Sequence, residues 1–106
     1  MPTRVVHCKR ESYDVYIGRP SKWGNPYSHL PAKRRTAPYG AASREAAIEA
    51  YRFWIHQPQQ AKLLAQVKEL KDKVLGCWCK PKPCHGDVLA EIADKENYNS
   101  AALVSK

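Results

Sequence analysis

Between residues 19 and 40 the chain is interrupted so often by proline and glycine that neither a continuous helix nor a central strand can form there. The stretch contains Pro20, Pro26, Pro31 and Pro38 together with two glycines. Proline lacks a backbone N–H and fixes φ, so it breaks helices and is confined to the edges of sheets. Aromatic side chains in the same stretch argue against disorder, because they give the loop apolar surface to bury. A structureless connection of this length in a small domain is commonly functional.

Apolar patterns on both sides of this loop predict an α/β fold. The expected elements, in chain order, are strands at residues 4–8 and 14–18, a helix capped by Ser43 and broken by Pro58, a helix at 59–71, a strand at 74–79 and a helix at 84–95. The order β-β-α-α-β-α predicts a small sandwich of two or three layers, with helices packed on a short sheet of about three or more strands. We expect a single domain at residues 1–96 and a flexible C-terminal tail at 97–106.

Composition narrows the class of protein. The chain has 106 residues and a net charge of +8, so we expect one basic domain that attracts nucleic acid or phosphorylated ligands. The simpler explanation of the same excess of lysine and arginine is that these charges keep the protein soluble and bind no specific partner. No signal peptide and no apolar run of bilayer length is present, which predicts a cytoplasmic protein with no membrane partner. In that compartment the four cysteines are expected to be reduced thiols, metal ligands or catalytic groups.

Two long motifs carry most of the chemistry-bearing residues. The first is RPSKWGNP at residues 19–26, and the second is CWCKPKPCHGDVL at residues 77–89. Together they resemble the R-x-S-K-W-G-N-P and C-x-C-x-P-x-P-C-H-x-D-x-L signatures of a small domain-of-unknown-function family of bacteriophages and bacteria. The resemblance spans nearly the whole chain. It implies a shared domain but no established activity, so function has to be argued from the residues.

The second motif offers candidate zinc ligands. Cys77 and Cys79 would point to the same side of a strand. A turn after Cys79 would bring Cys84 and His85 back toward them. Zinc takes four sulfur and nitrogen ligands, and Cys8 could complete the set. Against zinc, neighbouring cysteine and histidine residues rarely bind one ion together. Buried core thiols are the alternative interpretation of these cysteines.

The same motif also contains candidate catalytic residues. A thiol at Cys84 would lie at the start of the last helix, where the helix dipole stabilises a thiolate. His85 could act as the base and Asp87 could orient it, as in a nucleophilic triad. The structural alternative is that Asp87 accepts N–H bonds in the first turn of the helix and that His85 is a capping or partly exposed polar residue.

The first motif offers candidate ligand-binding residues. Arg19, Ser21, Lys22 and Asn25 surround the ring of Trp23 with groups that suit phosphate oxygens, and the ring itself suits a stacked base. The structural alternative is that Trp23 packs on the core and Asn25 ties down the loop backbone.

The two motifs would meet if strands 14–18 and 74–79 were parallel neighbours, because open α/β sheets bind ligands at the carboxyl edge. The sequence therefore predicts a pocket for a nucleotide, a nucleotide derivative or nucleic acid, compatible with binding alone or with hydrolytic or transfer chemistry. The alternative is a phage-type interaction protein that binds a host protein or DNA through its basic surface, with structural or zinc-binding cysteines. For that alternative the basic run Lys33, Arg34 and Arg35 would contact phosphate.

Overall fold

The central sheet of the protein has three parallel strands. The computed structural model describes residues 2–34 and 37–104, with the backbone alone for residues 96–104. Strands β1 (Arg4–His7), β2 (Val15–Tyr16) and β5 (Val74–Cys77) form the sheet in the order β1-β5-β2. β5 pairs in parallel with both neighbours, so all three strands end at the same edge. This parallel pairing meets the condition under which the two motifs were expected to converge.

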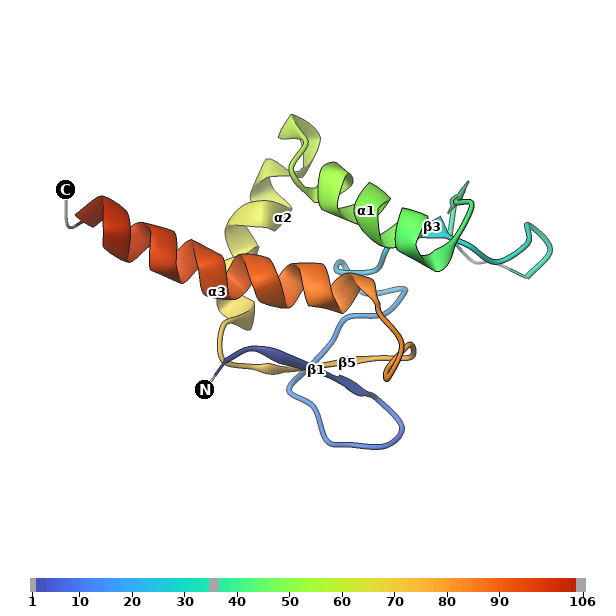
Figure 1. Cartoon of the computed structure of the whole chain (residues 1–106), viewed down its shortest axis with the longest axis horizontal. Coiled ribbons are helices and arrows are strands. Elements are labelled where there is room, and N and C mark those ends of the chain that lie inside the picture. The colour runs from blue at the N-terminus through green and yellow to red at the C-terminus, as the bar shows by residue number, and fades with distance from the viewer. Residues whose placement is uncertain (1, 35–36, 105–106) are drawn as a thin grey trace.

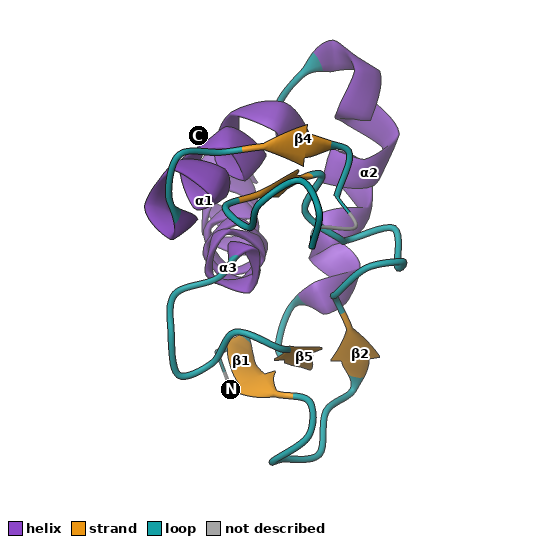
Figure 2. Cartoon of the chain, turned by 90° about the vertical axis from the view of Figure 1, so that its right-hand side faces the viewer, coloured by secondary structure: helices purple, strands orange, loops and turns teal. Residues whose placement is uncertain are grey.

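Helices cover one face of this sheet. They are α1 (Arg44–Ile55), α2 (Ala61–Gln66) and α3 (His85–Val104), with short 3₁₀ helices η1 (Pro58–Gln60) and η2 (Val67–Leu70) on either side of α2. Figures 1 and 2 show the three α-helices on the same side of the sheet, with α3 lying over it and running roughly along β1 and β5. The architecture is therefore a small two-layer α/β fold, and the predicted α/β class is confirmed. No helix in residues 2–34 and 37–104 is long and apolar enough to cross a membrane.

Several predicted boundaries were wrong. The strand expected at 74–79 ends at Cys77, because the chain turns there and the Lys82 N–H donates to the Cys79 carbonyl at 2.9 Å. The helix expected at 59–71 is divided into η1, α2 and η2. α3 continues to Val104, beyond its expected end near Lys95. The flexibility of a tail at 97–106 stays a prediction, and residues 105 and 106 lie outside the described residues.

The proline-rich loop contains a second, very small sheet. Strands β3 (Tyr27–Ser28) and β4 (Tyr39–Gly40) pair in parallel over two residues each. Figure 2 shows β4 beside the start of α1, away from the central sheet. The sequence did not predict these strands, because a two-residue strand has no apolar periodicity to detect.

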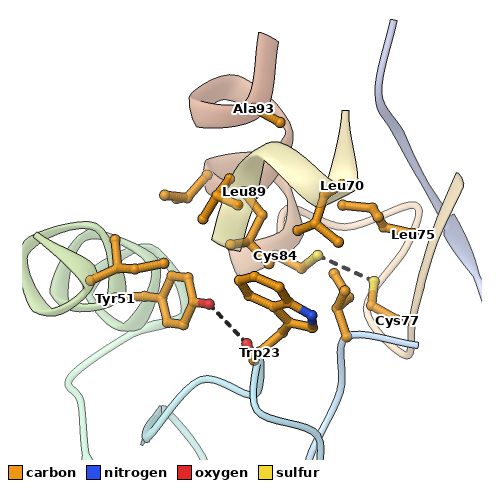
Figure 3. Packing of buried hydrophobic residues seen from close by; sticks show 12 residues of the cluster. Trp23, Tyr51, Leu70, Leu75, Cys77, Cys84, Leu89 and Ala93 are labelled. Carbon is orange, nitrogen blue, oxygen red and sulfur yellow. Dashed lines mark hydrogen bonds between the residues drawn. The ribbon is translucent and has the colours of Figure 1, made fainter. Parts of the chain in front are cut away.

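The hydrophobic core lies between the central sheet and the helices. Its fully buried side chains come from both layers and from the first loop: Ile17, Trp23, Tyr51, Ile55, Val67, Leu70, Leu75, Cys77, Cys84, Val88, Leu89 and Ala93. Figure 3 shows the Tyr51 hydroxyl pointing at the Trp23 carbonyl oxygen, to which it donates at 2.8 Å. Burial, together with the nearby Cys84, raises the pKa of Tyr51. This hydrogen bond ties the first loop to α1.

The predicted N-cap of α1 is formed. The Ser43 hydroxyl accepts a hydrogen bond of 3.0 Å from the backbone N–H of Ala46. Replacing Ser43 with alanine is expected to lower the free energy of unfolding by about 1 kcal/mol, because that N–H loses its partner. Urea unfolding monitored by circular dichroism measures the change. Ser43→Asp retains an acceptor and serves as the control, and an equal loss in both variants would contradict this role of the side chain.

Candidate functional site

A cavity of about 530 Å³ lies where the three strands of the central sheet end. Residues at or after the end of each strand contribute to it: His7 at the end of β1 and Arg10 after it, Gly18 and Arg19 after β2, and the segment 78–83 after β5. The start of α1 and the residues around β3 close the other side. We call this cavity the cleft. It brings the two sequence motifs together at one edge of the sheet.

The walls of the cleft carry an excess of positive charge. Five of its lining residues are cations: Arg10, Arg19, Arg44, Lys80 and Lys82. No aspartate or glutamate is among the lining residues in the described part of the chain. Asp87 lies just behind the wall, where its carboxylate is 2.7 Å from the Lys80 ammonium. Because same-sign charges in a concave site add their potentials, the cleft is suited to an anionic ligand.

Arg19 and Asn25 line the cleft and also hold its wall in place. The Arg19 guanidinium donates to the Asn25 carbonyl oxygen. The buried Asn25 amide donates to the Ala47 carbonyl at 3.1 Å and accepts from the Tyr27 N–H at 2.9 Å. These bonds connect the first loop to α1. Asn25 therefore has the structural role that the sequence offered as an alternative to ligand binding.

The other residues of the first motif do not line the cleft. Trp23 packs in the core with an exposed fraction of 3%, so its ring cannot stack on a base. The Ser21 hydroxyl accepts from the Trp23 N–H at 3.3 Å. Lys22 lies above the Trp23 ring and contacts Gln66 and Glu69 on the side of α2 and η2. Burial of the indole is favourable because a small domain has few side chains large enough to fill its core.

Trp78 supplies the exposed aromatic ring that Trp23 does not. It lines the cleft with 55% of its surface exposed. Its indole N–H donates to the Tyr16 hydroxyl at 2.8 Å, and its ring meets the edge of His7 at a centroid distance of 5.7 Å. Trp78 was not among the ligand-binding residues predicted from the sequence. The sequence feature that could have identified it is its position between Cys77 and Cys79, because alternate side chains of an extended segment point to opposite sides.

Cys84 and Asp87 form a cap at the start of α3. The Asp87 carboxylate accepts from the Cys84 N–H at 3.0 Å, while the Cys84 sulfur accepts from the Gly86 N–H at 3.2 Å. This reciprocal pattern is similar to a capping box, with cysteine in place of serine and the N–H of the second helical residue in place of the third. Asp87 therefore accepts a backbone N–H bond at the start of the helix, which is the structural alternative that the sequence offered for it. Because Asp87 is engaged by Cys84 and Lys80, it is not placed as an orienting partner for His85.

His85 is a buried residue in the wall of the cleft. Its Nε2 lies 2.7 Å from the Ile17 carbonyl oxygen, which can only accept, so Nε2 carries the proton. The ring also meets Tyr51 edge-on at a centroid distance of 5.0 Å. Burial lowers the pKa of His85 more than the Ile17 hydrogen bond raises it, so the ring is neutral at pH 7. The hydrogen bond from this neutral imidazole connects α3 to Ile17, the residue that follows β2.

Three thiols gather at one side of the cleft. The sulfur atoms of Cys77 and Cys84 are 3.2 Å apart and both residues are buried, as Figure 3 shows. Cys79 is half-buried and lines the same cavity. The neighbouring thiols of Cys77 and Cys84, with a smaller effect of Arg44, lower the pKa of Cys79. The pKa of Cys84 is raised, because its thiol bonds to the other two sulfurs and is buried.

The structure does not assemble the expected zinc ligands. Over residues 2–34 and 37–104, no group of three or more histidine, cysteine, aspartate or glutamate side chains is arranged to hold a metal ion. His85 directs its Nε2 to Ile17, and Cys84 accepts a helix N–H. Cys8 lies after β1, where its N–H donates to the Cys77 carbonyl at 2.8 Å. The donor set therefore does not fit zinc in this arrangement.

The basic run lies away from these residues. Lys33 and Arg34 are exposed in the loop between β3 and β4 and do not line the cleft. Arg35 lies outside the described residues.

Comparison with known proteins finds one family model and two similar viral proteins that are described as uncharacterized. Residues 4–95 match the family model "Domain of unknown function (DUF4326)". The chain is similar to an uncharacterized 12.4 kDa protein in the nrdA-td intergenic region of Enterobacteria phage T4, at 37% identity over 87% of this chain and 78% of that protein. It is also similar to an uncharacterized protein of Acanthamoeba polyphaga mimivirus, at 32% identity over 77% of this chain and 68% of that protein. No solved structure matches the chain.

The family match covers the central sheet, α1, α2 and the described side chains of α3, and so includes every residue that lines the cleft. The resemblance seen in the two sequence motifs is thereby supported over nearly the same span. The chain belongs to the DUF4326 family of domains of unknown function.

Proposed function

We propose that the cleft binds a phosphate-bearing small molecule, with a nucleotide or nucleotide derivative as the leading class. The observation that carries this proposal is the set of five cations around a cavity with no carboxylate among its described lining residues. Guanidinium and ammonium groups bind phosphate oxygens through charge-assisted hydrogen bonds, which are stronger than bonds between neutral groups. Arg44 and Lys82 are only loosely tied to the fold, since the Arg44 guanidinium lies 3.5 Å from the Pro83 carbonyl oxygen and Lys82 is exposed.

The size of the cleft supports a ligand larger than a phosphate ion. Small-molecule sites in proteins have volumes of about 300–1,000 Å³, and the cleft falls inside that range. Tyr27 and Trp78 add aromatic surface to its walls, and a nucleobase can stack on such rings. The combination of cations with an exposed indole favours a ligand that carries both a phosphate and an aromatic base.

A direct test compares adenosine monophosphate with adenosine by isothermal titration calorimetry. We expect the monophosphate to bind at least about tenfold more tightly, because only it engages the cations. Trp78→Ala should weaken its binding by a further factor of about ten, since stacking on an aromatic ring contributes about 1–3 kcal/mol per base. The control is Phe53→Ala, which removes a ring that is 69% exposed on α1 and outside the cleft. Equal affinity for adenosine and its monophosphate would contradict the proposal.

The alternative of a macromolecular partner makes a different prediction. A protein that binds DNA through its basic surface should respond to Lys33→Ser and Arg34→Ser, with a lower affinity and a smaller dependence on salt. The cleft proposal expects these two exposed positions to leave nucleotide binding unchanged.

A further inference from the structure

We propose that the cleft and a smaller pocket beside it hold two nucleosides joined through phosphate, with the linking phosphate bound where the two cavities meet. The inference rests on the proposed function, because it adds a second nucleoside position to the same site. Three observations carry it: a second cavity that shares a wall with the cleft, the hydrogen-bond donors on that wall, and the different lining of the second cavity.

The second cavity adjoins the cleft at the end of β1. It has a volume of about 270 Å³, and we call it the side pocket. Four of its lining residues also line the cleft: His7, Arg10, Lys80 and Pro81. We call these four residues the shared wall. A ligand that extends past the shared wall can therefore occupy both cavities.

The shared wall carries two cations with donors to spare. Arg10 is exposed, and its guanidinium takes part in no ion pair within the part of the chain that the structure describes. Its backbone N–H donates to the His7 carbonyl at 3.0 Å, which fixes the turn after β1. The Lys80 ammonium contacts Asp87 at 2.7 Å. An ammonium has three N–H donors, so this contact leaves others for a ligand.

His7 adds a neutral donor to the same wall. Its Nδ1 accepts the Lys9 backbone N–H at 3.0 Å, so the proton of the neutral ring is on Nε2. The shared wall thus combines a guanidinium, an ammonium and an imidazole N–H. Phosphate oxygens accept several hydrogen bonds at once, and bonds from charged donors are the stronger ones. The shared wall is therefore suited to a phosphate that lies between the two cavities.

The lining of the side pocket beyond the shared wall favours a nucleoside over a further phosphate. Val5 and Val6 give it apolar surface. Glu11 is the one carboxylate among its described lining residues, and Arg4 lies 3.6 Å from it. A carboxylate repels phosphate but accepts hydrogen bonds from sugar hydroxyl groups and from the amino group of a base. The cleft, with its cations, therefore differs from the side pocket in the part of the ligand that it suits.

Titration calorimetry with four ligands tests the second position. Adenosine monophosphate fills one nucleotide position, and adenosine diphosphate adds a phosphate without a second nucleoside. The dinucleotide pApA joins two nucleotides by a phosphodiester, whereas diadenosine pyrophosphate joins two nucleosides by a pyrophosphate. We expect one or both of these two-nucleoside ligands to bind at least about tenfold more tightly than either mononucleotide, because the link makes the second binding event intramolecular. Tighter binding of pApA would identify single-stranded nucleic acid as the source of the ligand, and tighter binding of the pyrophosphate would identify a dinucleotide cofactor.

Substitutions at Arg10 locate the linking phosphate. Arg10→Gln should lower the ratio of two-nucleoside affinity to adenosine monophosphate affinity by at least about fivefold, because it removes a charged donor from the shared wall. Arg10→Lys should retain most of that ratio. Arg34→Gln makes the same change in charge at an exposed position outside both cavities, and should leave the ratio unchanged.

The outcomes distinguish a failure of this inference from a failure of the proposed function. If adenosine monophosphate binds but neither two-nucleoside ligand binds more tightly than adenosine diphosphate, the second position is overturned and the proposed function stands. The same ratio in Arg10→Gln and Arg34→Gln would also overturn the second position, since the second nucleoside would then lie elsewhere. If none of the four ligands binds, both proposals fail.

Discussion

Replacing Arg44 and Lys82 together with glutamate is expected to weaken the binding of adenosine monophosphate by on the order of 100-fold. Arg44 lines the cleft from α1 and Lys82 lines it from the loop after β5, so the two positions reverse the charge of opposite elements. Each change removes an attraction to the phosphate and adds a repulsion. In a water-like dielectric, where two unit charges about 5 Å apart interact by about 0.8 kcal/mol, two such reversals cost about 3 kcal/mol in total.

The fold should tolerate both changes. Lys82 is exposed, and Arg44 is the first residue of α1, where a negative side chain interacts favourably with the helix dipole. Titration calorimetry measures the affinity, and urea unfolding confirms that stability is retained.

A charge-matched control distinguishes the cleft from the overall charge of the protein. Lys62→Glu with Lys68→Glu makes the same change in net charge on α2 and η2, at two exposed positions outside the cleft. We expect this variant to bind the nucleotide within about twofold of the unmodified protein at 0.15 M salt, where charges more than about 8 Å apart are screened. An equal loss in both double variants would show that the basic surface as a whole attracts the ligand, and would contradict a defined site.

Long periodic segments explain why much of the fold could be predicted from the sequence. α1 was identified from its apolar stripe, from Ser43 as its cap and from Pro58 as its limit, and all three features act locally. β1 and β5 were recognised as runs of β-branched and apolar residues. Their parallel pairing was not predicted, but it is consistent with the helices between them, because parallel strands need a crossover connection.

The site was harder to predict, because burial depends on tertiary packing. Trp23 and Trp78 both lie beside proline-rich turns, yet the first fills the core and the second is exposed. The chemical identity of Cys84 suggested a nucleophile, whereas its contacts show a helix cap that serine usually provides. Arg44 lies outside both motifs and enters the cleft only because α1 packs against the first loop.

The stability of the protein is expected to fall as the pH is lowered through the range below 6.5, and His85 is the cause. In the unfolded chain His85 takes up a proton near its ordinary pKa of 6.5. In the folded protein burial lowers that pKa, so the ring stays neutral until the pH is lower still. Between the two values the unfolded chain holds one more proton than the folded chain. Each unit of pH in that window therefore favours unfolding by up to about 1.4 kcal/mol.

His85→Gln isolates this effect. The glutamine amide can donate to the Ile17 carbonyl in place of Nε2 but does not titrate, so the variant should lose less stability between pH 7.5 and 5.5 than the unmodified protein. Urea unfolding at several pH values gives the two curves, and their difference removes the contribution of the carboxylates, which both proteins share. His29→Gln changes an exposed histidine and should leave the curve unaltered. Parallel curves for His85→Gln and the unmodified protein would mean that His85 accepts its proton as readily in the folded state as in the unfolded state, contrary to its burial in the wall of the cleft.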